Sequence, residues 1–502
     1  MSTPSSQAPW QAPWQRACVA GALVVMAAFY AWTAGTSEFP VWPRTGLAFY
    51  YNHLTNAFRA GQLHLLIQPR RELLALPDPY DPVANLPYRL HDAVLFKGKY
   101  YLYYGPVPAL LVYLPFREIT GLDFTDPLAV ALFSAMGLVF AFLLVQFLAR
   151  RYLPETPFWL VLAAIPALGF GNTLPYVLRR PLHYEVAIAA GYAFVFASIY
   201  CFVVGTLGDR LRRGWILMGS LLLGLAAGSR VPMLAAGLVP GVLALSVLWS
   251  RRDRPIRDQL ITLLAFFGPL TVCVALLLVY NVLRFGSWTE FGVNYTLIGV
   301  LPGGETVRTY KFYDAARVPF GLFYYVLAPP HYLAQFPFFF PQPWIYLVPP
   351  PNYYLEPTAG ILPMCPLLVV WFFAPVLLAQ SRGKPGSLWL VGAAIAGAGA
   401  VLLAQFTFAA VTMRYVVDFA TLFLVPALLL WYGSLNTLRE RSARARTALA
   451  AVFIGLLAAT VIVQTALSFV GTADNFKKGS PQTYEAIHAL FRPVEAWLRG
   501  GA

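Results

Sequence analysis

Apolar residues in this chain are grouped into long runs that are separated by short polar segments rich in arginine. A run of ~20 residues wound as an α-helix crosses the hydrocarbon core of a bilayer, which is about 30 Å thick. The pattern therefore predicts an all-α polytopic membrane protein with about eleven transmembrane helices. We place these helices at residues 17–34, 126–149, 156–177, 184–206, 214–230, 232–249, 259–283, 359–380, 386–410, 415–433 and 448–470.

Two long segments interrupt the runs, at residues 35–125 and 285–358. We expect residues 1–470 to form one transmembrane domain that carries both segments as long loops with interfacial helices, and residues 471–502 to form an amphipathic tail. The first run follows Arg16 and is too long for the apolar part of a signal peptide, so we expect it to remain as the first helix.

One apolar stretch, Tyr101 to Phe116, is excluded from the list of spans. It is short and contains Gly105, Pro106, Pro108 and Pro115. Proline removes backbone hydrogen bonds that lipid cannot replace. We therefore expect this stretch to lie in the membrane interface rather than to cross it.

The basic residues decide the predicted orientation. Clusters of arginine follow alternate runs, and an excess of Arg and Lys marks the cytoplasmic loops of a membrane protein. With a cytoplasmic N-terminus, every strong cluster becomes cytoplasmic, while both long loops and the C-terminus become extracytoplasmic, in an inner (plasma) membrane. The clusters are Arg150-Arg151, Arg210/Arg212/Arg213, Arg251/Arg252/Arg254/Arg257, Arg382/Lys384 and Arg439/Arg441/Arg444/Arg446.

Composition excludes several other classes of protein. Hydrophobic residues make up 59% of the chain and charged residues 12%, and the net charge of +14 is accounted for by the clusters at the ends of runs. We therefore expect no nucleic-acid partner. The chain contains no glycine-rich phosphate loop, and its four cysteines lie in or beside apolar runs without metal-ligand spacing. Side-chain chemistry is consequently expected at the extracytoplasmic face.

The first long loop carries the densest group of candidate catalytic residues. Its carboxylates are able to deprotonate a hydroxyl or to hold a divalent cation, and basic neighbours are able to neutralise a phosphate. The alternative is a purely structural turn, because aspartate beside proline is a favoured turn former. The candidates are Asp78, Asp81 and Asp92 as catalytic carboxylates, with Arg89, His91 and Lys99 in support.

A second group, Arg179, Arg180, His183 and Glu185, lies in the short turn before the fourth predicted helix. Charges beside hydrocarbon suggest a functional site. The two arginines are candidates for holding a phosphate, with Glu185 as a further catalytic candidate and His183 in support. The alternative is that the arginines bind lipid headgroups and Glu185 is their counter-ion.

A third group, Arg414 and Asp418, lies at the start of the tenth predicted helix. Residues four apart share a helix face, so these two are able to pair and simply neutralise each other. The alternative is that Arg414 holds a lipid phosphate, which a planar guanidinium suits well. Arg230, inside a long apolar stretch, is expected to mark a break between two short helices.

Aromatic residues crowd the second long loop, among them Phe336, Phe338 to Phe340, Trp344, Tyr346, Tyr353 and Tyr354. They suit short amphipathic segments at the headgroup level, serving either as an aromatic belt or as a groove for a lipid acceptor. The tail predicts a helix that begins at Ser480-Pro481. Its apolar stripe is expected on the membrane surface and consists of Tyr484, Ile487, Phe491, Val494 and Leu498.

Taken over nearly the whole chain, this arrangement resembles the GT-C superfamily of membrane glycosyltransferases. The shared features are one helix, a long loop bearing acids, and a body of helices with a second long loop after the seventh. Individual motifs are similar as well: Tyr104-Gly-Pro-Val-Pro-Ala-Leu-Leu, Arg179-Arg180 with Glu185, Tyr280-Asn-Val-Leu-Arg284, and Arg414-Tyr415. The resemblance implies a GT-C-like fold and an inverting transfer of sugar from a polyprenyl-phosphate donor to a lipid-linked or cell-envelope acceptor.

The chain departs from this family at one point. An Asp or Asp-Glu pair is expected shortly before the aromatic segment Tyr50-Tyr51, but the nearest preceding acid is Glu38. Either Glu38 or, as we prefer, one of the first-loop aspartates takes this place. The resemblance assigns the donor phosphate to Arg179, Arg180 or Arg414. It leaves open whether a divalent metal takes part, and no other cofactor is expected.

Two other classes of function compete with the transferase. A transporter or lipid flippase would place ionisable residues near the middle of the membrane, whereas most charges here lie at the ends of runs. A non-catalytic protein with a GT-C-like fold would keep the helices and lack the first-loop base. An assay of sugar transfer from a labelled donor distinguishes these three hypotheses.

Overall fold

The computed structural model describes residues 12–208, 210–341, 347–348, 350, 353–374 and 397–500. Within them, seven helices are long and apolar enough to cross a membrane, so the chain is a helical multi-pass membrane protein. These helices are α1 (Pro13–Gly35), α5 (Asp126–Tyr152), α8 (His183–Leu207), α10 with its preceding turn (Val231–Ser250), α11 (Ile256–Phe285), α16 with its preceding turn (Met413–Arg439) and α17 (Ala443–Val470).

Four shorter apolar helices accompany them: α6 (Phe158–Phe170), α9 (Arg213–Ser229), and the segments Ala315–Leu327 and Gly397–Thr407. The predicted span 156–177 is interrupted, because α6 ends at Phe170 and only a single turn, α7 (Leu174–Val177), follows. The predicted spans 359–380 and 386–410, and the basic pair Arg382/Lys384, lie partly or wholly outside the described residues. A count of about eleven spans therefore stays a prediction.

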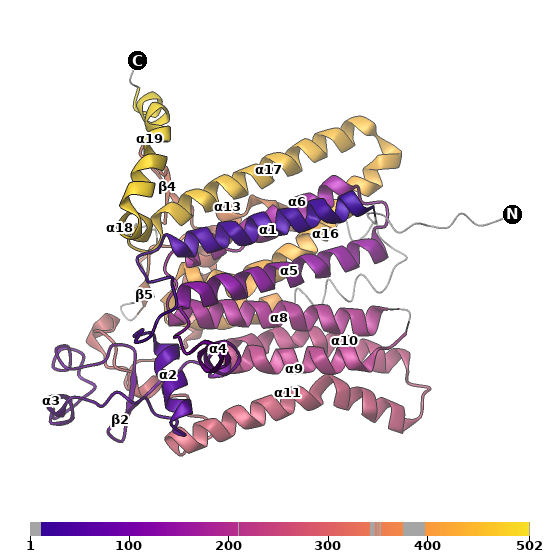
Figure 1. Cartoon of the computed structure of the whole chain (residues 1–502). Helices are drawn as coiled ribbons and strands as arrows, with labels where there is room; N and C mark the ends of the chain where they lie inside the picture. The colour runs from indigo at the N-terminus through magenta and orange to yellow at the C-terminus, as the bar shows by residue number, and fades with distance from the viewer. Residues whose placement is uncertain are drawn as a thin grey trace.

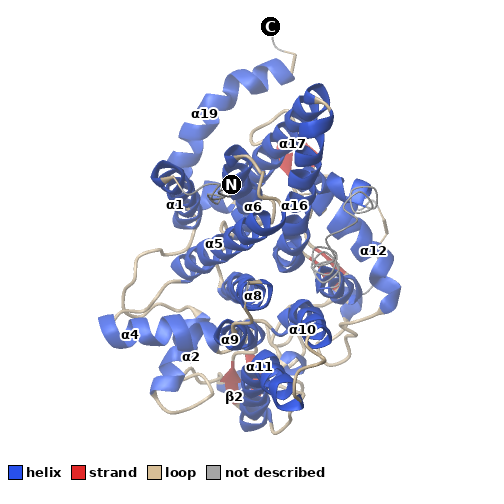
Figure 2. Cartoon of the chain, turned by 90° about the vertical axis from the view of Figure 1, so that its right-hand side faces the viewer, coloured by secondary structure: helices blue, strands red, loops and turns tan. Residues whose placement is uncertain are grey.

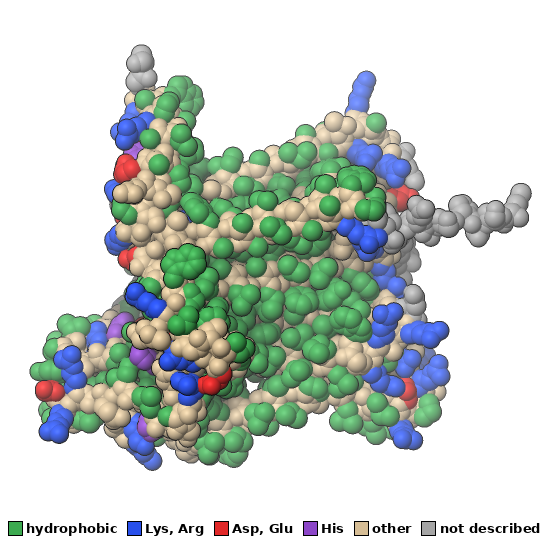
Figure 3. Space-filling view, in the orientation of Figure 1, with side chains coloured by type: hydrophobic (Ala, Val, Ile, Leu, Met, Phe, Trp, Pro, Cys, Tyr) green, Lys and Arg blue, Asp and Glu red, His purple; other side chains and the backbone are tan. Residues whose placement is uncertain are grey.

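The long helices run side by side, so the bundle has two ends that differ in chemistry (Figure 1). At one end, the basic end, short turns join α5 to α6, α10 to α11 and α16 to α17, and Lys and Arg gather on the surface (Figure 3). At the other, the loop end, lie residues 36–125, the described residues between 286 and 360, and residues 471–500. Within the described residues, the basic turns and the long loops thus lie at opposite ends of the bundle. Which end faces the cytoplasm stays a prediction.

The first loop contains short elements only. They are α2 (Tyr50–Arg59), α3 (Arg71–Leu74), the antiparallel hairpin of β1 (Val94–Phe96) and β2 (Lys99–Tyr101), the π-helical turn η1 (Ala109–Tyr113) and α4 (Leu114–Thr120). The stretch 101–116 is thus divided among a strand, a π-helical turn and a short helix. Figure 1 shows α4 end-on beside bundle helices that are seen from the side, so α4 runs across the direction of the spans. That this stretch does not cross the membrane stays a prediction.

The second loop is irregular, and it is joined to the first loop by an isolated bridge between Val94 and Thr296. Its strand β5 (Tyr354–Leu355) pairs in parallel with β6 (Ala410–Val411), which brings the end of this loop beside the start of α16. The other elements are η3 (Val293–Tyr295), η4 (Pro302–Gly304), η5 (Ala315–Arg317), α12 (Val318–Leu322), η6 (Phe323–Leu327), β3 (His331–Tyr332), β4 (Phe339–Phe340), α13 (Ile361–Met364) and η7 (Pro366–Phe373). The tail forms α18 (Asn475–Gly479) and α19 (Pro481–Leu498).

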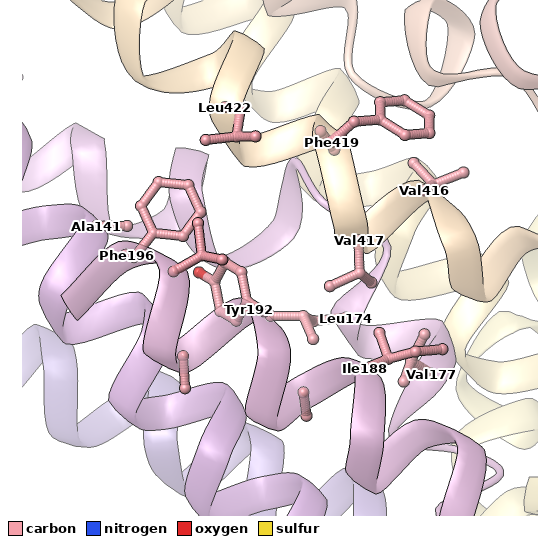
Figure 4. Close-up of a cluster of buried hydrophobic side chains, with 14 of the residues drawn as sticks. Ala141, Leu174, Val177, Ile188, Tyr192, Phe196, Val416, Val417, Phe419 and Leu422 are labelled. Carbon is pink, nitrogen blue, oxygen red and sulfur yellow. The ribbon is translucent and has the colours of Figure 1, made fainter. Parts of the chain in front are cut away.

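Helix α8 is the centre of the bundle. It is apolar on every side, as expected of a helix surrounded by others, and it packs between α5 and α9 (Figure 2). The ring of Tyr192 fills the space left by Gly137 of α5, where a Cβ would lie 2.1 Å from the ring. Figure 4 shows Ile188 and Tyr192 of α8 in one cluster with Val417 of α16. This burial holds the N-terminus of α8 in place at the loop end.

Candidate functional site

The first turn of α8 presents His183, Tyr184 and Glu185 at the loop end. The carboxylate of Glu185 accepts a hydrogen bond from the Leu182 backbone N–H at 3.2 Å, which closes the helix N-terminus and places an acid where the helix dipole favours it. His183 and Glu185 are buried, whereas Tyr184 is partly exposed. Of these three side chains, that of Tyr184 is therefore the one that is partly open at the surface.

Asp92 reaches this turn from the first loop. Its carboxylate accepts a hydrogen bond from the hydroxyl of Tyr184 and lies 3.5 Å from Nε2 of His91. The backbone N–H of Asp92 donates to the carbonyl of Leu297 at 2.9 Å, and its φ of 63° is in the left-handed region. Asp92 is only 7% exposed. The hydrogen bond between Asp92 and Leu297, which joins the two loops, therefore holds a buried acid against α8.

Asp78 and Asp81, the other first-loop candidates, occupy structural turns. Asp78 Oδ1 accepts from the Tyr80 N–H at 2.9 Å, and Asp81 Oδ1 accepts from the N–H groups of Val83 and Ala84 at 2.8 and 3.2 Å. Such side-chain to backbone bonds define Asx turns. Of the three aspartates, Asp92 makes the contact with α8, while Asp78 and Asp81 match the structural alternative that the sequence left open.

Two guanidinium groups flank the ring of Tyr184. The central carbon of Arg414 lies 5.1 Å from the ring centroid, and that of Arg180 lies 5.9 Å from it. Nη1 of Arg414 lies 3.2 Å from both carboxylate oxygens of Glu356, which follows strand β5. Arg180 is half-buried. Arg180 therefore places a positive charge beside Tyr184, whose hydroxyl is bound to Asp92. No acid within the described ranges forms an ion pair with this arginine.

Arg179 was expected to share this role, and the structure places it elsewhere. Its guanidinium is fully buried and donates to the carbonyls of Ser468 and Thr33 at 2.7 and 3.0 Å, and to the Thr36 hydroxyl at 2.5 Å. It also lies 4.2 Å from the ring centroid of Phe476. Burial lowers the pKa of Arg179 to about 9, which leaves it charged at neutral pH. Arg179 therefore joins α1, α17 and α18.

We expect Arg179→Gln to lower the free energy of unfolding by ~2 kcal/mol or more, because buried carbonyls that accept from a charged group lose their donor. A decrease in Tm of the purified protein in detergent measures this effect. The adjacent substitution Arg180→Gln is the matched control and should leave Tm unchanged. Equal effects of the two would contradict the structural assignment of Arg179.

The expected ion pair between Arg414 and Asp418 does not form. Residues Met413–Val416 make a 3-10 turn before α16 begins at Val417, so a spacing of four does not place the two on one α-helical face. Asp418 instead binds Arg230, with Nε 3.1 and 3.0 Å from its two oxygens and Nη2 2.7 Å from Oδ2. Gln405 donates to the same carboxylate at 2.9 Å.

Arg230 follows the last residue of α9, and a 3-10 turn, η2 (Val231–Gly237), begins after it, which confirms the predicted break. The ring of Tyr415 lies between the two arginines, 4.8 Å from Arg230 and 5.4 Å from Arg414. The pair of Arg230 and Asp418 is thus linked to Arg414 through this ring.

The supporting residues divide into two kinds. Arg89 joins the loops, since its Nη1 donates to the carbonyls of Ile298 and Pro82 at 3.0 and 2.9 Å and to Asn85 Oδ1 at 2.9 Å. Lys99 is exposed on the β1–β2 hairpin. His91 contacts Asp92, and His183 lies against the rings of Tyr50 and Tyr104 at 4.5 and 5.1 Å. The two histidines belong to the site.

Several site residues were missed from the sequence: Tyr50, Tyr104, Tyr184 and Glu356. Burial raises the pKa of Tyr104, so its hydroxyl stays protonated at neutral pH. The motif around Tyr104 carried a usable signal, because Gly105 packs on the end of α9, where a Cβ would lie 1.9 Å from the carbonyl oxygen of Gly228. Glu356 carried no such sequence signal, because no pattern in the second loop distinguishes it from the other residues there.

Metal binding was left open by the sequence. Among the residues that the structure describes, no group of three or more His, Cys, Asp or Glu side chains is arranged to hold a metal ion. Glu38, the other candidate for the first acid, accepts a hydrogen bond from Asn475 at 2.6 Å and so fastens the tail to the end of α1.

Comparisons with known proteins give likenesses of structure only. No protein-family model matches the chain, and no curated protein matches its sequence. ArnT from Cupriavidus metallidurans bound to undecaprenyl phosphate is 14% identical with a TM-score of 0.42, over 96% of this chain and 80% of that one. The apo form of that ArnT has a TM-score of 0.44 at 14% identity, over 93% of this chain and 77% of its own.

The archaeal oligosaccharyltransferase AglB from Archaeoglobus fulgidus, in complex with an inhibitory peptide and a dolichol phosphate, is 12% identical with a TM-score of 0.44. The match covers 92% of this chain and 57% of AglB. Because the identities are low and the TM-scores lie below 0.5, the chemistry of the site has to be read from this chain's own residues.

Proposed function

We propose that this chain is an inverting glycosyltransferase of the GT-C type, which moves a sugar from a polyprenyl phosphate to an acceptor hydroxyl. One observation carries the proposal: Tyr184 binds the carboxylate of Asp92 through its hydroxyl, while the guanidinium groups of Arg180 and Arg414 lie beside its ring. A base and two phosphate-binding cations are thereby brought to one place at the membrane surface.

In the proposed reaction, Asp92 accepts the proton of the acceptor hydroxyl as its oxygen forms a bond to the anomeric carbon. The bond from that carbon to the phosphate oxygen breaks, and its electron pair leaves with the lipid phosphate. Arg180 and Arg414 stabilise the charge that develops on the phosphate, since a guanidinium donates two parallel hydrogen bonds to phosphate oxygens. Glu185 is buried and interacts electrostatically with both arginines, so it partly balances their charge.

The proposal predicts that Arg180→Gln weakens binding of a polyprenyl phosphate about tenfold, because one charge-assisted contact is lost. Undecaprenyl phosphate binding to the purified protein in lipid nanodiscs measures this directly, without knowledge of the sugar or the acceptor. Lys99→Gln, which removes an exposed cation of the same loop face, is the control and should bind as the unaltered protein does. Identical affinities for all three proteins would refute a phosphate site at Arg180.

We also propose that the loop end faces away from the cytoplasm, because the opposite end carries the arginine clusters. Reporter fusions at Glu440, in the last turn of α16 (Val417–Arg441), and at the C-terminus are expected on opposite sides of the membrane. Both reporters on one side would overturn the orientation and, with it, an extracytoplasmic site.

A further inference from the structure

Helix α19 has three faces, and one of them is occupied by the second loop. The ring of Phe336 lies 5.6 Å from Tyr484, 5.5 Å from His488 and 5.1 Å from Phe491, and the carboxylate of Glu495 accepts a hydrogen bond from its backbone N–H. Part of the predicted membrane stripe, Tyr484 and Phe491, is thus turned towards protein.

A second face of α19 is apolar and uncovered. Leu490 is 75% exposed, Trp497 is 76% exposed, and Val494 and Leu498 are 41% and 46% exposed. Spacings of four, seven and eight residues from Leu490 place these side chains on one side of a helix. The third face is polar and carries Glu485, Arg492 and Arg499.

The direction of α19 shows what lies against its uncovered face. Figure 1 shows α19 running across the axis of the bundle at the loop end, and in Figure 2, where the bundle is seen end-on, it extends past α1 and α17 beyond the outline of the helices. Hydrophobic side chains gather on the side of α19 that faces the zone of the spans, and charged ones on the opposite side (Figure 3). A bilayer around apolar helices of this length occupies that zone, outside the perimeter of the bundle.

The short helix α4 repeats this arrangement at another point of the perimeter. It also lies across the bundle axis in Figures 1 and 2, and Ile119 on it is 83% exposed. Leu110 and Leu111, in the turn before it, are exposed as well. Apolar side chains that face outwards therefore occur at the loop end in two separate segments.

We propose that α19 is an interfacial helix that inserts its face of Leu490, Val494, Trp497 and Leu498 into the headgroup layer of the bilayer. Tryptophan favours this layer because its ring is apolar and its N–H is polar. Lys477 and Lys478 of α18, next to α19, add attraction to anionic lipid phosphates. Through Phe336 and Glu495, the helix ties the second loop to the membrane surface. A lipid bilayer, rather than a second copy or another protein, is the partner.

Spin labels on single cysteines test this proposal without reference to catalysis. In a background without the four native cysteines, labels at Leu490 and Trp497 report on the apolar face, and labels at Ala489 and Ala496 are matched controls on exposed positions of the polar side. The protein is reconstituted into vesicles of phosphatidylcholine with a minority of phosphatidylglycerol. Accessibility to oxygen, which concentrates in lipid, is compared with accessibility to a water-soluble nickel chelate.

We expect the first two labels to be reached mainly by oxygen and the two controls mainly by nickel. Nickel access at all four positions would overturn the proposal and show a helix free in water. Low access to both reagents at Leu490 and Trp497, with spin–spin broadening between chains, would overturn it in favour of a second copy. Because all four positions are exposed, none of the labels disturbs the packed face, and Tm of each variant verifies folding.

Discussion

Replacing Asp92 with asparagine is expected to lower the rate of sugar transfer by about 10²–10⁴-fold, the usual contribution of a general base. Asparagine keeps the shape of the side chain and an oxygen that accepts from the Tyr184 hydroxyl, but its amide cannot take a proton from the acceptor. Binding of undecaprenyl phosphate should be unchanged, because Arg180 and Arg414 remain. The loss should therefore appear in kcat and not in the affinity for the donor.

Transfer from radiolabelled polyprenyl-phosphate sugars to membrane acceptors measures this effect with folded, purified protein. Asp81→Asn is the matched control: it is the same substitution in the same loop, at a carboxylate that only caps a turn. The rate of sugar transfer by this variant should stay within a fewfold of that of the unaltered protein. Full activity of Asp92→Asn would remove the base from the mechanism, and loss of activity in Asp81→Asn alone would move the base to Asp81.

Breaking the pair of Arg230 and Asp418 should cause the largest loss of stability, about 3–5 kcal/mol, because an uncompensated charge is left in a buried position. The side chain of Asp418 is fully buried, and that of Arg230 is 12% exposed. Arg230→Met leaves the acid with Gln405 as its remaining side-chain donor. Since Tyr415 lies between Arg230 and Arg414, the same variant should also weaken binding of the lipid phosphate.

Thermal unfolding in detergent checks this prediction, and the double variant Arg230→Met/Asp418→Leu separates charge from packing. Removing both charges should restore most of the stability, as replacement of buried pairs by apolar residues often does. Arg213 and Asp258 at the basic end form a pair with 35% and 30% of their side chains exposed. Breaking that pair should change Tm little, because water and salt screen exposed charges. A double variant as unstable as Arg230→Met would mean that packing, and not the unpaired charge, sets the cost.

The transmembrane helices were predicted from local properties of the sequence, namely hydropathy, proline content and charge. These predictions were correct where each depended on a single segment. A continuous apolar run has no alternative in lipid except a helix, which explains why the helices around 126–149 and 184–206 were placed correctly. Prolines in the stretch 101–116 excluded a span for the same reason. Arg230 indicated a break because a charge interrupted an apolar stretch.

Assignments of partners failed where they relied on distance along the chain. Arg414 and Asp418 are four residues apart, yet Asp418 binds Arg230, which lies 188 positions away, and Arg414 binds Glu356, 58 positions away. Arg179 and Arg180 are adjacent and face different surroundings, one enclosed by α1, α17 and α18 and the other beside Tyr184. In a turn, successive side chains point to different sides. The amino-acid composition of the segment does not show which of these sides is buried.

The sequence by itself determined that this is a helical membrane protein, and it predicted how the helices alternate and that the histidines and most acids lie at one end. These properties depend on hydropathy, proline content and charge, which act residue by residue. Only the tertiary structure decided that Asp92, and not Asp78 or Asp81, meets Tyr184, and that Arg180 and Arg414, and not Arg179, lie beside its ring. Those choices depend on contacts between two long loops and the start of α8, and the energy of such contacts is not contained in any single segment.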